Sequence, residues 1–475
     1  MRWDAFLGGT YSSLAWTADC EETINWYWEK LASPGASAPM ALYPTPGVTL
    51  LSDTVSGSAR AHWYENGREF AVLGSRLVEF DVFGAQTDRG AVAVDQNPAT
   101  ISSNGPNGHQ LFITSGDNGY IFDMNANTLT QISALTGKST MGAFLAGFFL
   151  NLDASTATLY WSALFDGTSW TTGTDYAQRS LASDPWKALK VFNRYAYLLG
   201  EHTFEMWYVV GGTTPLTADP NTLMPYGILA PWSLTVLGET LVWLGSSAGD
   251  RICLLATQGL QPQIFSTQPI ETAIGSYSYP LSIGDSYGEH GHTFYLLHFD
   301  LDGITLAYDM TTQLWHKRGS WSKGQWSALR PRYHELAFNQ HRVVDSSTGA
   351  LYQQQISSGY DADGNVIRRL RRAPALFNED QYITYPGLQL DIEPGLGNVV
   401  DPGSDPQVML RYSNDAGKTW KPEQMRSAGK IGEYQKRVRF TRLGMARRRA
   451  FEVSVTDPIP WRVTGAYLID PEPGQ

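Results

Sequence analysis

The sequence predicts an all-β protein in which a β-propeller of six or seven blades is followed by a C-terminal β-sandwich. Short apolar or aromatic patches recur at intervals of roughly 40–50 residues, which is the period of a four-stranded propeller blade. Aromatic residues make up 12% of the chain and there are 46 glycines, a composition that favours many short strands joined by tight turns. With 42% hydrophobic and only 17% charged residues, the chain is expected to bury a large core.

Residues 1–55 differ in pattern from the repeats that follow them. The run 25–30 is amphiphilic, and Pro-Gly pairs interrupt the chain at 34–35 and at 46–47. The sequence therefore predicts an irregular N-terminal leader laid along a larger body, where it could complete the C-terminal region. Asp4 lies close to the start and no basic stretch is followed by an apolar one, so a signal peptide is not expected.

Residues 56–360 are expected to form the propeller. The recurring patches lie at residues 77–81, 119–123, 158–161, 203–207, 251–254, 305–309 and 349–352. Turn-forming pairs such as Asn66-Gly67 and Asp302-Gly303 lie between them. A single four-stranded sheet cannot bury both of its faces, whereas blades packed radially bury one another. A row of β-sandwiches with coincidental spacing is the alternative, and so degenerate a repeat leaves six or seven blades open.

Residues 361–475 are expected to form a β-sandwich or platform region, because longer alternating stretches appear at 388–393 and 451–455. Residues 413–420 match the pattern S-x-D-x-G-x-T-W, an Asp-box-like hairpin. In such a hairpin the carboxylate accepts hydrogen bonds from turn amides, the glycine takes a positive φ, and the tryptophan packs on the body. We assign this hairpin a structural role, with the pattern residues Ser413, Asp415, Gly417, Thr419 and Trp420.

Charge is distributed unevenly along the chain. Residues 366–450 hold 16 Lys and Arg against 9 Asp and Glu, a net of +7, so the rest of the chain carries −18 of the total of −11. An acidic body repels a nucleic-acid backbone, which disfavours a DNA-binding enzyme and suits a channel through which DNA slides. Arginine pairs well with carboxylates across interfaces. The candidate interface residues are Arg368, Arg369, Arg371, Arg372, Arg437, Arg439, Arg447, Arg448 and Arg449. Solvated strand faces are the alternative interpretation.

The sequence lacks the motifs of the common catalytic and metal sites, so we expect no catalytic residues, no metal and no cofactor. Cys20 and Cys253 are too few to frame a metal site and are expected to be buried thiols. His290 and His292 are expected to form a surface or interface pair, since no third ligand lies at zinc-site spacing. A sialidase-like glycosidase needs an arginine cluster and a tyrosine paired with a carboxylate, and it is the less favoured enzymatic alternative.

Several of these segments also carry a family likeness. The stretches 411–420, 432–444 and 451–458, together with 191–207 and the early 25–47, resemble the phage packaged-DNA stabilisation protein family. These proteins are the tail hub or nozzle proteins of short-tailed phages. The resemblance spans nearly the whole chain, and its C-terminal part is the most specific.

The resemblance implies a structural virion protein without catalytic residues, made in the host cytoplasm and located in the short tail. It implies a homo-hexameric ring below the portal and its adaptor or head-completion protein, in contact with tailspikes or tail fibres and with a tail needle or plug. DNA would be passing cargo, retained until ejection, and stable membrane insertion is not expected. A host-glycan-binding propeller, as a fibre or lectin module, is the alternative, and tryptophans clustered in one pocket would favour it.

Overall fold

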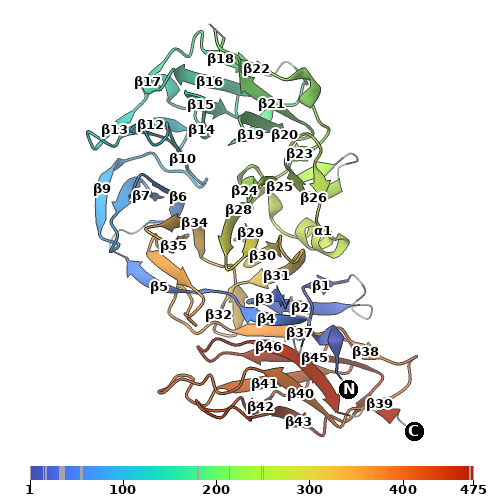
Figure 1. Cartoon of the computed structure of the whole chain (residues 1–475). Coiled ribbons are helices and arrows are strands. Elements are labelled where there is room, and N and C mark those ends of the chain that lie inside the picture. Colours follow the sequence, from blue (N-terminus) through green and yellow to red (C-terminus); the bar gives the residue numbers. More distant parts are fainter. Residues whose placement is uncertain are drawn as a thin grey trace.

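The structure is a computed structural model that describes residues 2–13, 15, 19–31, 38–53, 57–178, 181–212, 214–247, 249, 251–469 and 472–473. Its regular elements are almost all β-strands, and the described residues contain one α-helix, α1 (Gln268–Gly275). The expected all-β fold, a propeller followed by a sandwich, is confirmed. Figure 1 shows the propeller as a ring of sheets above the sandwich, and both chain ends lie at the sandwich.

Four consecutive antiparallel sheets form the first four blades, in which the strands follow one another from the propeller axis outward. The first two blades consist of β6 (Ala59–Glu65), β7 (Arg68–Leu73), β8 (Arg76–Phe80), β9 (Gln86–Ala91), β10 (Thr100–Ser103), β11 (Gln110–Ser115), β12 (Asn118–Asp123) and β13 (Thr128–Gln131). The next two consist of β14 (Met141–Leu145), β15 (Phe148–Asp153), β16 (Thr158–Ala163), β17 (Asp166–Trp170), β18 (Tyr176–Gln178), β19 (Trp186–Phe192), β20 (Tyr195–Gly200), β21 (Phe204–Val209) and β22 (Leu216–Ala218).

The fifth blade has an interrupted inner strand. Two short strands pair with the same edge of the next strand, and the 3-10 turn η4 (Pro231–Ser233) lies between them. The strands of this blade are β23 (Gly227–Ile228), β24 (Thr235–Leu237), β25 (Thr240–Ser247), β26 (Arg251–Thr257) and β27 (Gln263–Ile264). The sixth blade, with the hairpin that follows it, consists of β28 (Ile283–Glu289), β29 (His292–Phe299), β30 (Ile304–Asp309), β31 (Leu314–Arg318), β32 (Ser320–Ser322) and β33 (Gln325–Ser327).

Local turn chemistry explains why neighbouring strands pair as hairpins. Asn66 and Gly67 connect β6 to β7 with φ values of 53° and 73°. Two consecutive positive φ angles give the turn whose twist matches that of the flanking strands, and asparagine and glycine tolerate them best. The Asn-Gly pair thus fixes the register in which Glu65 lies opposite Arg68.

The seventh blade closes the ring with a strand from the other end of the propeller sequence. Its inner strands are β34 (Pro331–Ala337), β35 (Gln340–Asp345) and β36 (Leu351–Gln355), and its outermost strand is β5 (Gly47–Ser52). Gln353 lies opposite Thr49 in this pairing. The propeller therefore has seven blades, and its first and last parts are joined by β-sheet hydrogen bonds.

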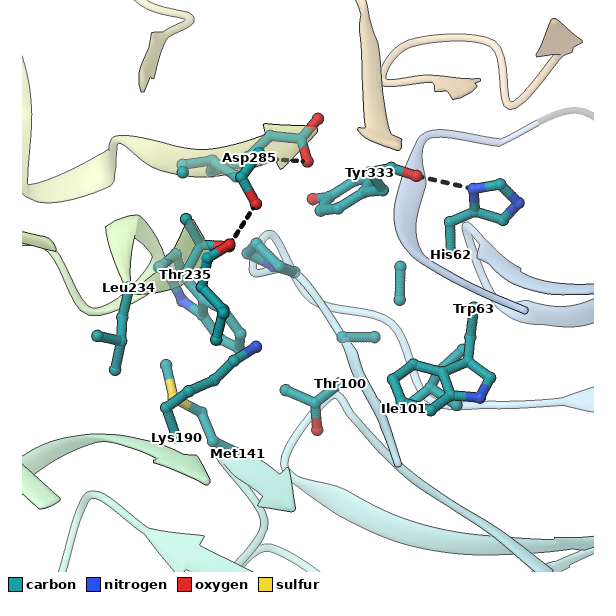
Figure 2. Close-up of a pocket in the computed structure, with 18 of the residues that line it drawn as sticks. His62, Trp63, Thr100, Ile101, Met141, Lys190, Leu234, Thr235, Asp285 and Tyr333 are labelled. Carbon is teal, nitrogen blue, oxygen red and sulfur yellow. Dashed lines mark hydrogen bonds between the residues drawn. The ribbon is translucent and has the colours of Figure 1, made fainter. Parts of the chain in front are cut away.

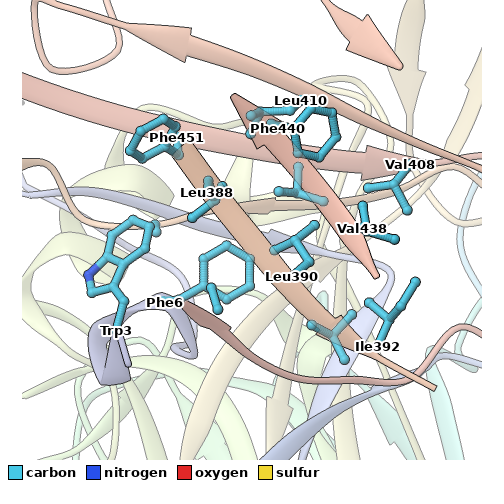
Figure 3. Packing of buried hydrophobic residues seen from close by; sticks show 14 of the residues in the cluster. Trp3, Phe6, Leu388, Leu390, Ile392, Val408, Leu410, Val438, Phe440 and Phe451 are labelled. Atoms are coloured by element: carbon cyan, nitrogen blue, oxygen red, sulfur yellow. The ribbon is translucent and has the colours of Figure 1, made fainter. Parts of the chain in front are cut away.

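Two five-stranded arrangements pack face to face to form the sandwich. One has the order β3-β4-β46-β40-β43 and the other the order β2-β37-β45-β41-β42. Their bounds are β2 (Cys20–Ile24), β3 (Trp26–Lys30), β4 (Met40–Pro44), β37 (Arg369–Arg372), β40 (Gly387–Ile392), β41 (Gln407–Ser413), β42 (Gln424–Ser427), β43 (Val438–Thr441), β45 (Arg448–Val455) and β46 (Val463–Ile469). Figure 3 shows the apolar core between the sheets, to which Trp3 and Phe6 from the N-terminal segment contribute beside Leu388 and Phe451.

The N-terminal segment is not the irregular leader that the sequence predicts. Its described residues contain β2, β3 and β4, which belong to the sandwich, and β5, which belongs to the propeller. The prediction fails because β2, β4 and β5 pair with partners more than 300 residues away, as in the register of Thr23 with Arg371. The segment therefore ties the two domains together.

One residue in this segment also joins the domains directly. At the bend between β2 and β3, Asn25 has a φ of 58°, and its side-chain amide donates to the carbonyls of Gly319 and Arg368 at 2.8 Å each. Its amide oxygen accepts from the Gly319 N–H at 3.0 Å. Beside it, Ile24 pairs in parallel with Lys317, so the sheet of the sixth blade continues into the sandwich.

Candidate functional site

The innermost strands of all seven blades surround a cavity on the propeller axis, which we call the axial cavity. It encloses about 340 Å³, within the size range of small-molecule sites. Its lining comes from β6, β10, β14, β19, the η4–β24 segment, β28 and β34. Figure 2 shows Lys190 and Asp285 on different sides of this cavity, with the Lys190 side chain extending into it. The sequence gives no local signal for this cavity, because its lining is spread over seven separate strands.

Ionisable side chains in the axial cavity have pKa values shifted by burial. Burial raises the pKa of Asp285 to about 6 and that of Glu335 to about 7. Burial also lowers the pKa of Lys190, and the nearby charge of Glu335 opposes that shift. Burial disfavours the charged form of each group. A bound ligand of opposite charge would favour that charged form and would bind more tightly for this reason.

The histidines at the axial cavity are held by partners within the chain. His62 bonds through Nε2 to Glu69 at 2.9 Å and through Nδ1 to the Tyr333 carbonyl at 2.7 Å. Burial opposes protonation of His62, but the hydrogen bond and charge of Glu69 raise its pKa overall. His334 lies 2.8 Å from His341, and burial with this neighbour lowers the pKa of His334 to about 3. These histidines are structural parts of the cavity wall.

The Asp-box-like hairpin lies at the end of β41 in the sandwich. Asp415 accepts hydrogen bonds from the N–H groups of Lys418 and Thr419 at 3.0 and 2.8 Å and from the Thr419 hydroxyl at 2.6 Å. The Gly417 N–H donates to the Ser413 hydroxyl at 2.8 Å, and the φ of Gly417 is 98°. Burial opposes ionisation of Asp415, but these hydrogen bonds lower its pKa to about 2.

The tryptophan of this hairpin, Trp420, does not belong to the buried core. Trp420 is half-buried, and the guanidinium groups of Arg372 and Arg411 lie 5.1 and 4.7 Å from its ring centre. Both arginines also pair with Glu452. The hairpin is therefore attached to the sheet by cation–π contacts above a buried ion pair.

Four of the nine candidate arginines point into the chain, and we call Arg369, Arg371, Arg372 and Arg449 the inner arginines. Each is at most 9% exposed. Arg371 donates to the carbonyls of Phe6 and Gly9 and pairs with Glu21. The inner arginines are not available to a neighbouring subunit, which corrects the sequence-based assignment for these four residues.

The remaining inner arginines also use their donors within the chain. Arg449 donates to the Leu443 carbonyl at 2.8 Å and stacks on Tyr412 at 4.3 Å. Arg369 donates weakly to the Thr45 carbonyl at 3.4 Å, and burial lowers its pKa to about 10. Arg369 lies on β37 and Arg449 on the neighbouring β45, and both strands have sheet partners on either side.

Four other candidates are exposed, and we call Arg437, Arg439, Arg447 and Arg448 the outer arginines. Their contacts are weak: Arg439 donates to Gln389, and Arg447 lies 3.8 Å from the exposed Asp380. Exposed pairs of this kind contribute little to folding. Arg368 is intermediate, half-buried with its guanidinium 4.4 Å from the Trp321 ring centre.

The two histidines near residue 290 do not form a surface pair. His292 is buried and bonds to Asp309 and Glu29 at 2.8 Å each, whereas His290 is exposed. Burial opposes protonation of His292, but both carboxylates raise its pKa. Because Glu29 belongs to β3 of the sandwich, His292 is another contact between the domains, and the sequence-based assignment is corrected. Within the described ranges, no group of three or more His, Cys, Asp or Glu side chains is arranged to hold a metal ion.

Comparison with known proteins agrees with this two-domain architecture. The model of the family described as "Bacteriophage P22 Gp10, beta-propeller" matches residues 27–356. The model described as "Bacteriophage P22 Gp10, beta-sandwich" matches residues 368–468. The chain belongs to the bacteriophage P22 Gp10 family. The resemblance to packaged-DNA stabilisation proteins is thereby confirmed, and membership of the Gp10 family supports a structural role in a phage particle.

Other comparisons add little to this assignment. No protein of curated function matches the chain. Virginiamycin B lyase from Staphylococcus aureus is 7% identical with a TM-score of 0.43 over 65% of this chain and 98% of its own. YCF48 from Cyanidioschyzon merolae is 10% identical with a TM-score of 0.40 over 65% of this chain and 98% of its own. Neither similarity carries an argument about function. No helix in the described part of the chain has the length and apolar character needed to cross a bilayer.

Proposed function

We propose that this chain is a tail hub or nozzle subunit of a short-tailed phage. Six copies form a ring below the portal and its adaptor protein. The ring retains packaged DNA, provides the channel for its ejection, and offers attachment points for tailspikes or fibres and for a needle or plug. On this proposal the protein has no enzymatic activity and resides in the virion after synthesis in the host cytoplasm.

The observation that carries the proposal is the match of both Gp10 domains, in order, over nearly the whole chain. The architecture supports it, because strands from one N-terminal segment belong to both domains. A subunit built in this way keeps its domains together when the ring bears the pressure of packaged DNA. The charge of −18 outside residues 366–450 supports a channel to which DNA does not adhere.

Deleting the gene from the phage that encodes it tests the proposal. We expect particles without this protein to lose their DNA after packaging and to lack complete tails, and a plasmid copy should restore both. DNA content per particle and electron microscopy of the particles give the two readouts. Full retention of DNA with normal tails in the deletion phage would overturn the proposal.

The outer arginines are the proposed contacts with a neighbouring subunit or with the adaptor. They are exposed and lack strong partners within the chain, so a neighbour's carboxylates can pair with them. The double variant Arg447→Glu and Arg448→Glu should raise the concentration needed for ring assembly about tenfold, since like charges then meet at each seam. The matched control is Arg194→Glu with Lys323→Glu, which changes the net charge equally on the propeller.

Mass photometry over a concentration series measures this effect. The control should assemble as the wild type does, and both variants should melt at the wild-type temperature. Equal assembly of the outer-arginine variant and the control would remove the outer arginines from the seam. Arg449 is left out of the variant because it is buried.

A second candidate function is binding of a host glycan in the axial cavity. The specific observation in its favour is that two tryptophans, Trp63 and Trp232, line the same cavity. Tryptophan rings stack on the apolar faces of sugars and are common in such sites. Binding of the purified protein to a host-surface polysaccharide, abolished in Trp232→Ala, would support this function, and no binding would reject it.

A further inference from the structure

Opposite charges lie on separate walls of the axial cavity. Lys190 comes from β19 in the fourth blade, whereas Asp285 and Glu335 come from β28 in the sixth blade and β34 in the seventh. In Figure 2 the Lys190 side chain extends from one side toward the open space, and Asp285 lies on another side of it. The cavity thus has a cationic wall and an acidic wall.

These groups do not satisfy one another. In the part of the chain that the structure describes, Lys190 forms no ion pair and Glu335 accepts no side-chain hydrogen bond, although the charge of each shifts the pKa of the other. The carboxylate of Asp285 accepts from backbone N–H groups, among them those of Ser286 and His334 at 2.8 and 3.4 Å, and the charge of Arg332 also favours its ionised form. Asp285 is 8% exposed. A charge that burial disfavours gains when a ligand supplies a partner of opposite sign.

Part of the wall between the charged groups is apolar. Met141 of the third blade, Leu189 of the fourth and Trp232 and Leu234 of the fifth line the cavity, beside the polar side chains of Thr235 and Ser286. A ligand that spans the cavity therefore meets hydrocarbon between its polar ends. Lys190 and Glu335 are only half-buried, so small solutes can reach them.

We propose that the axial cavity binds a small zwitterionic ligand of the amino-acid class. Its ammonium group pairs with Asp285 and Glu335, its carboxylate pairs with Lys190, and its aliphatic part lies against the apolar wall. A simple cation would leave Lys190 without a partner and a simple anion would leave both carboxylates without one. A neutral sugar would form weaker hydrogen bonds with the same groups, because charge-assisted bonds are stronger than neutral ones.

Burial of the carboxyl groups agrees with this arrangement. It raises the pKa of Asp285 to about 6 and that of Glu335 to about 7, and an ammonium group beside them would favour their ionised forms. The inference does not depend on the proposed tail function, since it concerns the propeller axis of a single subunit.

Calorimetric titration of the full-length protein tests the proposal. The probes are glycine, 4-aminobutyrate and 6-aminohexanoate, with butylamine, butyrate and galactose as controls. We expect at least one zwitterion to bind about tenfold more tightly than every control, because it forms one more charge-assisted contact. Absence of zwitterion binding, or equal binding of butylamine, butyrate or galactose, would overturn the proposal on the wild-type protein alone.

Variants then locate the site. Lys190→Met should weaken binding of the best zwitterion about tenfold and leave butylamine unaffected, whereas Glu335→Gln should weaken both. The matched controls are Lys187→Met, on the same strand but paired with Glu201, and Glu239→Gln in an exposed turn. Unchanged affinity in a folded Lys190→Met protein would place the zwitterion elsewhere and overturn the proposal.

Discussion

The inner and outer arginines of the sandwich have the same chemistry but opposite surroundings. Within the run 447–449, Arg447 and Arg448 are exposed and Arg449 is 1% exposed. The inner arginines donate to carbonyls and pair with carboxylates inside the chain, whereas the outer arginines have weak contacts at most. Adjacent arginines in a basic run therefore need not share one surface. Some stabilise the fold from inside, and others are exposed to solvent.

The difference also explains why the sandwich depends on the N-terminal segment. Arg371 bonds to atoms of Phe6, Gly9, Thr23 and Glu21, all from that segment. The positive charge on β37 thus meets acceptors from the opposite end of the chain. Substitution of an inner arginine should therefore lower the stability of the fold. Substitution of an outer arginine should instead weaken assembly.

The largest effect is expected for Arg371→Met. Methionine keeps most of the side-chain length but removes the ion pair with Glu21 and leaves the Phe6 carbonyl without its arginine donor, which should cost about 3–5 kcal/mol of unfolding free energy. Chemical denaturation followed by tryptophan fluorescence measures this change. The control Arg439→Met, at an outer position, should stay within about 0.5 kcal/mol of wild type. Similar losses for the two variants would remove the distinction between inner and outer arginines.

Acid should lower the stability of the fold by protonating Glu22, which pairs with the inner arginine Arg372. Burial opposes its ionisation, but Lys317 at 2.7 Å and Arg372 at 3.1 Å lower the pKa of this carboxyl overall. A lowered folded-state pKa adds stability above the ordinary value near 4.5, and that stability is lost as pH falls through the folded pKa. Glu22→Gln should cost about 2–3 kcal/mol at pH 7 and flatten the decline below pH 4.5.

The pH series is read from denaturation midpoints between pH 3 and pH 7. The outer-position control Arg439→Met should retain the wild-type decline. A Glu22→Gln profile parallel to wild type throughout would show that Glu22 is not the titrating partner of Arg372.

A smaller effect is expected for Trp420→Ala. Sequence reasoning treats this residue as a buried anchor whose loss costs about 3–5 kcal/mol. In the structure the ring is half-buried and contacts Arg372 and Arg411, so the variant loses two cation–π contacts and part of the buried apolar area, about 1–2 kcal/mol. Trp420→Phe should recover part of that amount. A loss above about 3 kcal/mol would mean that the ring is a core element.

The smallest effect is expected for Asp415→Ala. The variant loses hydrogen bonds to Lys418 and Thr419 in an exposed turn, where water replaces them, so about 1 kcal/mol should be lost. Asp415→Asn should retain part of the network and lose less. Thermal melting of the two variants checks the order, and an unfolded Asp415→Ala protein would contradict it.

Local features of the fold could be predicted from the sequence, whereas features that depend on distant partners could not. The turn at Asn66-Gly67 and the hydrogen bonds of Asp415 lie within a few residues, so residue type and spacing suffice. The strand β5 joins β36 across some 300 residues, which is why the blade number stays open in the sequence. Burial of Arg371 depends in the same way on Phe6 and Glu21.

The axial cavity illustrates the same limit at a candidate site. Lys190 in the fourth blade and Glu335 in the seventh lie three blades apart in the sequence and line the same cavity only because the ring closes. Neither residue has a motif around it, and periodicity assigns each only to a strand. The closure that brings them together is carried by strand pairing of the N-terminal segment.

The central claim is that this chain forms a ring in a phage tail, and cryo-electron microscopy of tails from purified virions tests it most directly. We expect six copies of the subunit around the DNA channel, with the inner arginines buried within each subunit. We also expect the channel wall to be acidic or neutral. The outer arginines should lie at contacts with neighbouring proteins; they are Arg437, Arg439, Arg447 and Arg448. A tail without this protein, or a channel lined by these four arginines with no neighbour in contact, would contradict the account.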